Sequence, residues 1–106
     1  DAAAEGQWEA ALAGFRKFRQ EGGVETPELI SLEAVCWYKL ERYDVAEELL
    51  GRAIAVRPDD PLNWRNLGVL HLRRGGRAEA LEALVRSYRL DPENDDLRRM
   101  IEELRR

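Results

Sequence analysis

A period of 34 residues runs through the chain and constrains its fold more than any other feature. Three pairs of residues suited to start a helix are spaced by 34 positions: Thr26-Pro27, Asp60-Pro61 and Asn94-Asp95. Each pair offers a side-chain oxygen that can cap a helix, and Pro takes the first helical position in two of them. Because a fixed period of this length is typical of stacked structural units, the sequence predicts a repeat protein.

Each period contains two helices. Apolar residues recur at helical spacing and are interrupted once per unit, at Glu41-Arg42 in the first and at Gly75-Gly76 in the second. Small residues also recur at the same shift, from Ala34 to Gly68 and from Ala46 to Ala80. Small residues let two helices approach closely while large ones fill the space around the contact. Each unit is therefore predicted to be a helical hairpin.

The second unit carries a motif that identifies the type of repeat. Its residues are Trp64-x2-Leu67-Gly68-x2-His71, then Ala80-x3-Leu84, then Pro92. This order is similar to the tetratricopeptide repeat, W-x2-L-G-x2-Y, A-x3-F, P, with His71 for the Tyr and Leu84 for the Phe. The unit 27–60 keeps the pattern at Ala34, Trp37, Ala46, Leu50 and Pro58.

Two parts of the chain depart from that pattern. In the unit 27–60, Ile30 stands for the Trp and Glu33 for the Leu. Upstream, the segment Gly6-Gln7-Trp8-Glu9-x-Ala11-x3-Phe15-x2-Phe18 resembles only the second half of another repeat. Residues 1–5 would then be the stub of that repeat's first helix.

The resemblance implies an all-α fold, a tetratricopeptide-type α-solenoid of stacked antiparallel helical hairpins with a C-terminal capping helix. It would form a single domain over 1–106, with a partial repeat at 1–26, full repeats at 27–60 and 61–94, and the cap at 95–106. The cap is amphipathic, with an apolar stripe at Leu97, Met100, Ile101 and Leu104. The predicted helices are Gln7–Arg19, Pro27–Leu40, Tyr43–Val56, Pro61–Arg74, Arg77–Arg89 and Asp95–Arg105.

Composition excludes several classes of partner and location. The 106 residues include 17 Lys and Arg against 21 Asp and Glu, a net charge of −4 with the signs intermixed, which argues against nucleic acid. No apolar run approaches the roughly 18 residues of a membrane-spanning helix, so we expect no membrane insertion. Cys36 is alone and no signal peptide is visible, which predicts a cytoplasmic protein. The start at Asp1 rather than Met suggests a fragment or a processed chain.

The sequence offers no catalytic constellation. Cys36 is interpreted as an inert small apolar residue and His71 as a packed or partly exposed structural histidine. One His and one Cys cannot supply the usual four zinc ligands. The acidic run Asp91–Asp96 resembles a calcium loop but has Asp96 where the sharp turn needs Gly, so the acids are interpreted as helix caps. We therefore predict a chain that is not an enzyme and needs no cofactor or metal.

The first helix of each predicted hairpin carries a second stripe of residues that the hairpin contact does not use. In the helix from Pro61, the residues of the repeat pattern face the hairpin and leave Arg65, Val69 and Leu72 on another side. In tetratricopeptide arrays the first helices line a concave face that binds peptides, so the resemblance implies a groove. Its predicted residues are Val35, Tyr38, Lys39, Arg65, Asn66, Val69, Leu72 and Arg73. The alternative is that Val35, Val69 and Leu72 pack between adjacent first helices.

The predicted function is a non-catalytic interaction module that binds a peptide segment or a partner protein. Arg65 and Arg73 would complement an acidic ligand. The alternative is a regulatory or dimerisation module cut from a larger enzyme or signalling protein, for which self-association is possible. The sequence does not identify the partner.

Overall fold

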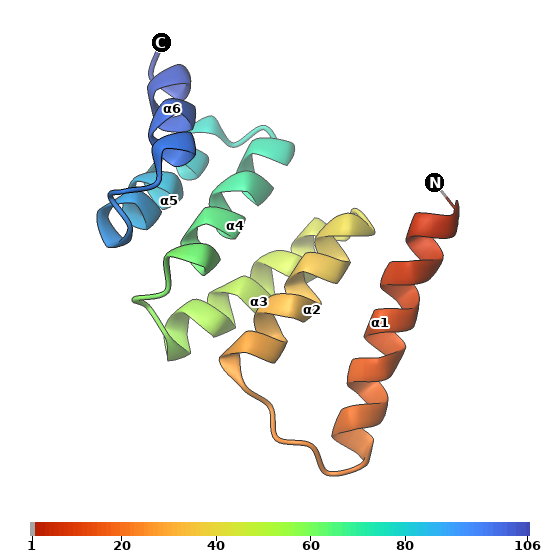
Figure 1. Cartoon of the computed structure of the whole chain (residues 1–106). Helices are drawn as coiled ribbons and strands as arrows, with labels where there is room; N and C mark the ends of the chain where they lie inside the picture. Colours follow the sequence, from red (N-terminus) through yellow and green to blue (C-terminus); the bar gives the residue numbers. More distant parts are fainter. Residues whose placement is uncertain (1) are drawn as a thin grey trace. The chain divides into compact units, whose positions relative to one another are not determined.

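The computed structural model describes residues 2–106, and this part of the chain is all helical (Figure 1). The helices are α1 (Ala2–Gln20), α2 (Pro27–Lys39), α3 (Tyr43–Val56), α4 (Pro61–Arg73), α5 (Arg77–Leu90) and α6 (Asp95–Leu104). They form two compact units, one up to Val56 and one from Arg57 onward. In the first unit α2 packs against both α1 and α3, and in the second α5 packs against both α4 and α6. The predicted all-α fold of helical hairpins is confirmed.

The first helix is longer than predicted. Residues 2–5, expected to be the stub of a separate helix, are continuous with the rest of α1, so that expectation is wrong. The physical reason is local, because Ala2, Ala3, Ala4 and Glu5 are strong helix formers and a single Gly6 lowers helix stability without ending the helix. Asp1 lies outside the described residues.

The three predicted helix starts are confirmed. At each one the cap side-chain oxygen accepts a hydrogen bond from a backbone N–H two or three residues later, which satisfies a donor that the helix itself leaves unpaired. These oxygens belong to Thr26, Asp60 and Asn94, at donor–acceptor distances of 3.3, 3.0 and 3.0 Å. At α6 the cap is therefore Asn94 rather than one of the acids around it, while Asp95 and Asp96 lie in the first turn, where carboxylates favour the helix dipole.

Three helices end in the same backbone turn. Each has a residue with positive φ just after its end: Gly22 at 86°, Glu41 at 62° and Gly75 at 80°. The turn after α2 is closed by the Arg42 N–H, which donates to the Trp37 carbonyl at 2.9 Å. Glycine adopts this left-handed conformation without steric cost, whereas a side chain such as that of Glu41 does not.

Small residues bring the helices of each hairpin together, as predicted. In the first unit Ala34 and Ala46 are buried between the helices that pack together. In the second unit a Cβ atom added at Gly68 would lie 2.6 Å from Leu84 Cγ and 3.2 Å from the Ala80 carbonyl oxygen. The absence of a side chain at Gly68 therefore sets how closely α4 and α5 approach.

The last helix is joined to its unit by apolar and polar contacts. Leu97 and Ile101 form a buried cluster with Leu84 of α5, so the apolar stripe of α6 faces inward as predicted. At the other end, the Arg77 Nε–H donates to the Leu104 carbonyl at 2.8 Å. A cation at a helix C-terminus satisfies free carbonyls and favours the negative end of the helix dipole.

Glu41→Gly is expected to raise the free energy of unfolding by about 1 kcal/mol, because it removes the steric cost of a side chain in the left-handed region. Gly75→Glu is the matched reverse change one period later and should lower it by a similar amount. Urea unfolding of both variants is the measurement. A Glu41→Gly variant no more stable than the parent would contradict the strain at this turn.

Gly68→Leu is expected to lower the free energy of unfolding by about 1 to 3 kcal/mol, because the new side chain overpacks the contact with buried Leu84. Gly51→Leu in α3 is the control, since an added Cβ there meets nothing within 4 Å. That change should be neutral or stabilising, because Leu favours the helix over Gly by several tenths of a kcal/mol. Equal effects of the two variants in thermal unfolding would show that Gly68 does not set the approach.

Candidate functional site

The predicted groove residues of the first unit lie in the C-terminal half of α2. Val35 and Tyr38 are half-buried and Lys39 is exposed. The Tyr38 ring meets the Tyr43 ring edge to face, with centroids 5.7 Å apart and planes inclined by 60°. The Lys39 ammonium lies 5.8 Å from the centroid of the Trp8 ring. These contacts hold Tyr38 and Lys39 in place within their own unit.

The predicted groove residues of the second unit divide into two groups. Arg65 and Arg73 are exposed, whereas Asn66, Val69 and Leu72 are half-buried. Leu72 packs against the cluster that joins α5 to α6. Truncating Leu72 would therefore disturb the core of the unit as well as any ligand contact.

Two exposed leucines belong to the same helix sides and were not among the predicted groove residues. Leu32 on α2 is 53% exposed and Leu62 on α4 is 51% exposed. Each lies three residues before a predicted groove residue, Val35 and Arg65 respectively, which places it on the same side of its helix. The helical spacing of a further apolar residue was the signal that could have identified them.

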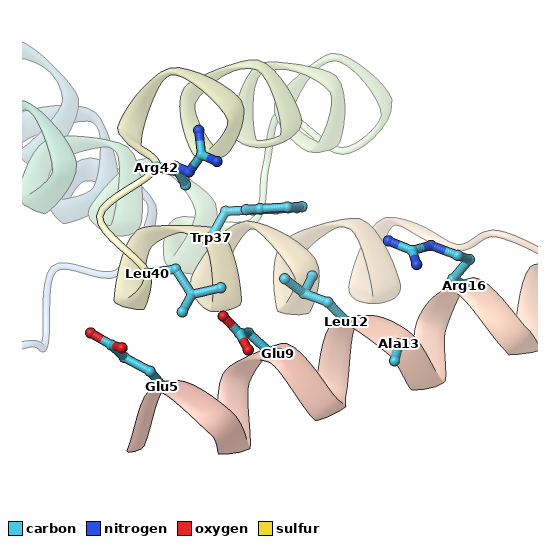
Figure 2. A pocket seen from close by; sticks show the side chains of 8 residues that line it. All are labelled: Glu5, Glu9, Leu12, Ala13, Arg16, Trp37, Leu40 and Arg42. Atoms are coloured by element: carbon cyan, nitrogen blue, oxygen red, sulfur yellow. The ribbon is translucent and has the colours of Figure 1, made fainter. Parts of the chain in front are cut away.

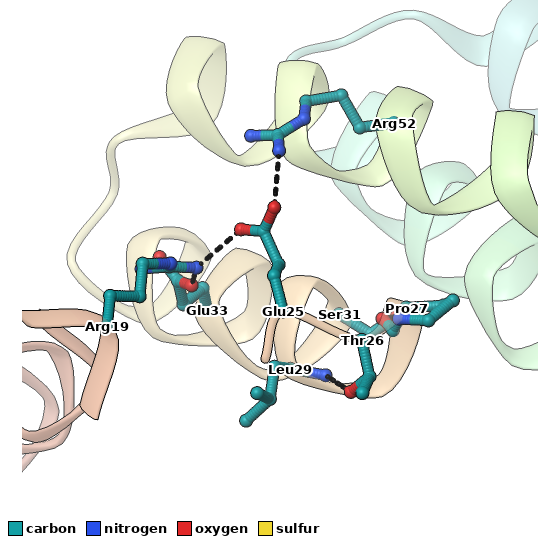
Figure 3. A network of polar contacts seen from close by, with 8 residues as sticks. All are labelled: Arg19, Glu25, Thr26, Pro27, Leu29, Ser31, Glu33 and Arg52. Carbon is teal, nitrogen blue, oxygen red and sulfur yellow. Dashed lines mark hydrogen bonds and ion pairs between the residues drawn. The ribbon is translucent and has the colours of Figure 1, made fainter. Parts of the chain in front are cut away.

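A polar network joins the three helices of the first unit (Figure 3). Glu33 of α2 is only 8% exposed and is paired with the guanidinium of Arg19 from the last turn of α1. Arg19 also pairs with Glu25 at 2.8 Å, and Glu25 pairs in turn with Arg52 of α3 at 3.0 Å. Glu33 stands where the repeat pattern has Leu, and Arg19 explains how an acid is accommodated there.

This network lowers the pKa of Glu25, which lies between Arg19 and Arg52. The hydrogen bond from Arg19 holds the pKa of Glu25 below its ordinary value, although desolvation opposes the shift. The positive charge of Arg52 acts in the same direction as the hydrogen bond. A carboxylate stabilised in its charged form suits a structural ion pair better than proton transfer near neutral pH.

A cleft of about 460 Å³ lies between α1 and α2 (Figure 2). Its apolar part is formed by Leu12, Trp37 and Leu40, and charged side chains of both signs surround it. The full lining is Glu5, Glu9, Leu12, Ala13, Arg16, Trp37, Leu40 and Arg42. None of its four charged residues forms an ion pair with another residue of the described chain. The cleft therefore presents, beside an aromatic ring, two carboxylates and two guanidiniums without ion-pair partners among residues 2–106.

Neither of the two residues considered for chemistry lines this cleft. Cys36 is buried, and burial raises the pKa of its thiol, so the reactive thiolate is disfavoured. The interpretation of Cys36 as an inert packed residue is supported. His71 is half-buried in α4, and its carbonyl accepts a hydrogen bond from the Gly76 N–H at 2.8 Å.

The described residues 2–106 contain neither a cluster of metal-ligating side chains nor a membrane-spanning helix. No group of three or more His, Cys, Asp or Glu side chains in this range is arranged to hold a metal ion. None of the helices there combines the length and the apolar character needed to cross a bilayer.

The ion pairs of Glu25 predict a pH dependence of stability. Because the pKa of Glu25 is lowered in the folded state, its stabilising contribution is present above the ordinary glutamate pKa of about 4.3 and is lost as the pH falls through the folded value. Partial exposure of both partners keeps the contribution modest. When the pH is lowered from about 6 to about 3, the free energy of unfolding measured in urea should therefore fall less for Glu25→Gln than for the parent.

Glu21→Gln is the control for this prediction. Glu21 is exposed and its only recorded ion pair, with Lys17, is long at 4.0 Å. Its removal should leave the pH dependence of the parent nearly intact. A parent and a Glu25→Gln variant with the same pH dependence would show that the network does not contribute to stability.

Comparison with known proteins rests on structure, because no family model and no curated protein matches the sequence. The chaperone SycD of Yersinia enterocolitica type III secretion, solved with a peptide of the translocator YopD, matches with a TM-score of 0.81 and 16% identity. The match covers 97% of this chain and 83% of SycD. MamA matches with a TM-score of 0.81 and 18% identity over 92% of this chain.

A TPR repeat-containing protein from Cytophaga hutchinsonii matches over 90% of this chain and 38% of that one, with a TM-score of 0.74 and 19% identity. The chain spans about half the length of the two MamA chains it matches, 46% and 52%. At such low identity the likeness concerns the fold. It confirms the resemblance found in the sequence: the chain has the fold of tetratricopeptide-repeat proteins.

Proposed function

We propose that the chain is a non-catalytic interaction module that binds a peptide segment of a partner protein through the outward sides of α2 and α4. The observation that carries this proposal is the exposure of Leu32 and Leu62, one on each first helix. Leu32 lies one helical turn before buried Cys36, and Leu62 lies one turn before half-buried Asn66, so each leucine is exposed beside residues that the fold covers. Exposed large apolar side chains beside half-buried ones are typical of protein-binding surfaces.

The charges on these helix sides suggest the character of the peptide. Lys39 on α2 and Arg65 and Arg73 on α4 are exposed next to apolar residues. Such a combination complements a segment that presents apolar side chains together with carboxylates. The SycD structure, which holds a peptide on the same fold, supports peptide binding as a use of this architecture.

The cleft of the first unit can serve the same function. Its apolar part is suited to one side chain of the peptide, and Trp37 provides an aromatic surface there. Glu9 and Arg16 can each pair with a charge of the opposite sign on the ligand. These features fit a polar, extended ligand better than a small apolar molecule.

The Leu32→Ser and Leu62→Ser double variant tests the proposal on an array of immobilised short peptides of varied sequence. Because both side chains are exposed, each change should alter the free energy of unfolding by less than about 0.5 kcal/mol. Binding to the peptides that the parent retains should weaken by more than about 1 kcal/mol. Val24→Ser with Val56→Ser removes two exposed apolar side chains elsewhere and is the matched control.

The control should bind the same peptides as the parent. Two results would count against the proposal: a double variant that binds as well as the parent, or a folded parent that retains no peptide from the array. A large loss of stability in the double variant would instead assign Leu32 and Leu62 to the core.

A further inference from the structure

The outer face of α5 carries two exposed arginines, Arg86 and Arg89, whereas its half-buried Leu81 and Val85 also pack against the cluster that joins α5 to α6. The helix buries Ala80, Leu84 and Ser87, and Ser87 donates a hydrogen bond to the Pro61 carbonyl of α4 at 2.8 Å. On its other side lie two clefts of about 420 and 220 Å³. Arg86 and Arg89 line both of them.

The arginines lie among apolar side chains. Leu81 and Val85 line the larger cleft and are half-buried, while Trp64 and Leu90 line the smaller one. Leu90 is 42% exposed. We call the set of Arg86, Arg89, Leu81, Val85, Trp64 and Leu90 the α5 face. Glu82 lines the larger cleft as well, one turn before Arg86, so the face combines two cations and one carboxylate with apolar surface within the second unit alone.

Arg86 is held in a defined position. Its guanidinium carbon lies 4.8 Å from the centroid of the Trp64 ring, and the Trp64 Nε1–H donates to the Pro58 carbonyl at 2.9 Å. The ring is therefore fixed by its own hydrogen bond, and the guanidinium stacks on a fixed surface. Stacking of this kind leaves the N–H groups at the guanidinium edge available to an acceptor and reduces the entropy lost on binding.

Neither arginine is neutralised within the described chain. No carboxylate of residues 2–106 pairs with Arg86 or Arg89, although the protein has a net charge of −4. On the neighbouring helix, by contrast, Arg98 pairs with Glu102 and Arg99 with Asp96. Two unpaired guanidiniums on one helix face favour a carboxylate-bearing partner, because paired Arg–carboxylate contacts are strong and directional.

The repeat itself provides a comparison. One period earlier, Arg86 corresponds to Arg52, which is already paired with Glu25 at 3.0 Å. Leu81 corresponds to Glu47, and Val85 to Gly51. The matching side of α3 thus lacks the unpaired charge. Its apolar surface differs in part, because exposed Val56 matches Leu90, whereas Leu81 and Val85 also pack against the cluster that joins α5 to α6.

We propose that the α5 face docks an acidic amphipathic peptide segment of a partner protein. Carboxylates of the segment pair with Arg86 and Arg89, and its apolar side chains lie against Leu81 and Val85 or against Leu90. The apolar surface beside the arginines selects a peptide over a small inorganic anion. This surface lies on α5 except for Trp64, which is on another side of α4 from Leu62. The function proposed above uses the outward sides of α2 and α4, so the two proposals can fail independently.

The test is a titration of the isotope-labelled full chain, followed by nuclear magnetic resonance. The probe is a short synthetic peptide with Leu at helical spacing and Glu between, and a second peptide has Ser in place of each Leu. The Leu/Glu peptide is expected to shift the Nε–H signals of Arg86 and Arg89 and the indole N–H signal of Trp64. The Ser/Glu peptide should bind at least about tenfold more weakly, because it lacks the apolar contacts.

Matched variants assign the binding to this face. Arg86→Glu with Arg89→Glu should weaken binding by about tenfold or more. Arg98→Glu with Arg99→Glu makes the same change of net charge on α6 and should leave the affinity nearly unchanged. Arg86→Lys with Arg89→Lys keeps the charge and should show an intermediate loss, because Lys lacks the planar fork that stacks on Trp64.

Several results would overturn the proposal. Equal binding of the Ser/Glu peptide would reduce the face to an anion site, and equal loss in both charge-reversed pairs would indicate unspecific attraction. Absence of any shift at Arg86, Arg89 and Trp64 rejects docking at this face. Shifts confined to α2 and to the Leu62 side of α4, with none at Trp64, Arg86 or Arg89, would do the same while supporting the function proposed for the first helices.

Discussion

The close approach of two helices within each hairpin is the constraint on which the other features depend. In the second unit it requires Gly68, because Leu84 and the backbone at Ala80 occupy the space that a side chain would need. The contact at Gly68 covers one side of α4, and Leu70, nearly opposite Gly68 around the helix, is buried as well. Leu62 lies between these two covered sides, where it stays exposed.

The parts of the fold that depend on local chemistry were predictable from the sequence. Caps such as Thr26 and Asn94 act on N–H groups three residues away, so their spacing alone located the helix starts. The partner of Glu33 was not predictable, because Arg19 lies fourteen residues away on a helix whose packing the repeat pattern did not specify. The sequence marked Glu33 as a departure from the pattern, and only the tertiary structure supplies its counter-charge.

The candidate site was predicted less well than the fold, for a related reason. Helical periodicity indicates which residues share a side of a helix, but not how far a neighbouring helix covers that side. Leu72 shares the stripe with Arg65, yet α5 and α6 reach it and make it part of their cluster. Leu62 lies nearer the start of the same helix and stays exposed. Whether a stripe residue belongs to a groove or to the core depends on whether a neighbouring helix covers it. Helical periodicity within α4 does not show which of its residues α5 and α6 cover.

Pairing of charges separates structural arginines from those left to bind. Arg52 is bound to Glu25, and that pair depends on the loop before α2 and on Arg19. Its counterpart Arg86 lines a cleft with Pro58 of the corresponding loop before α4 but is not paired with a carboxylate there. It stacks instead on Trp64, where the first repeat has Ile30. The same position in the repeat therefore stabilises the fold in one unit and presents a directed cation in the other. Because an unpaired guanidinium gains most from an added carboxylate, the asymmetry between the two repeats is where a partner's specificity is expected to arise.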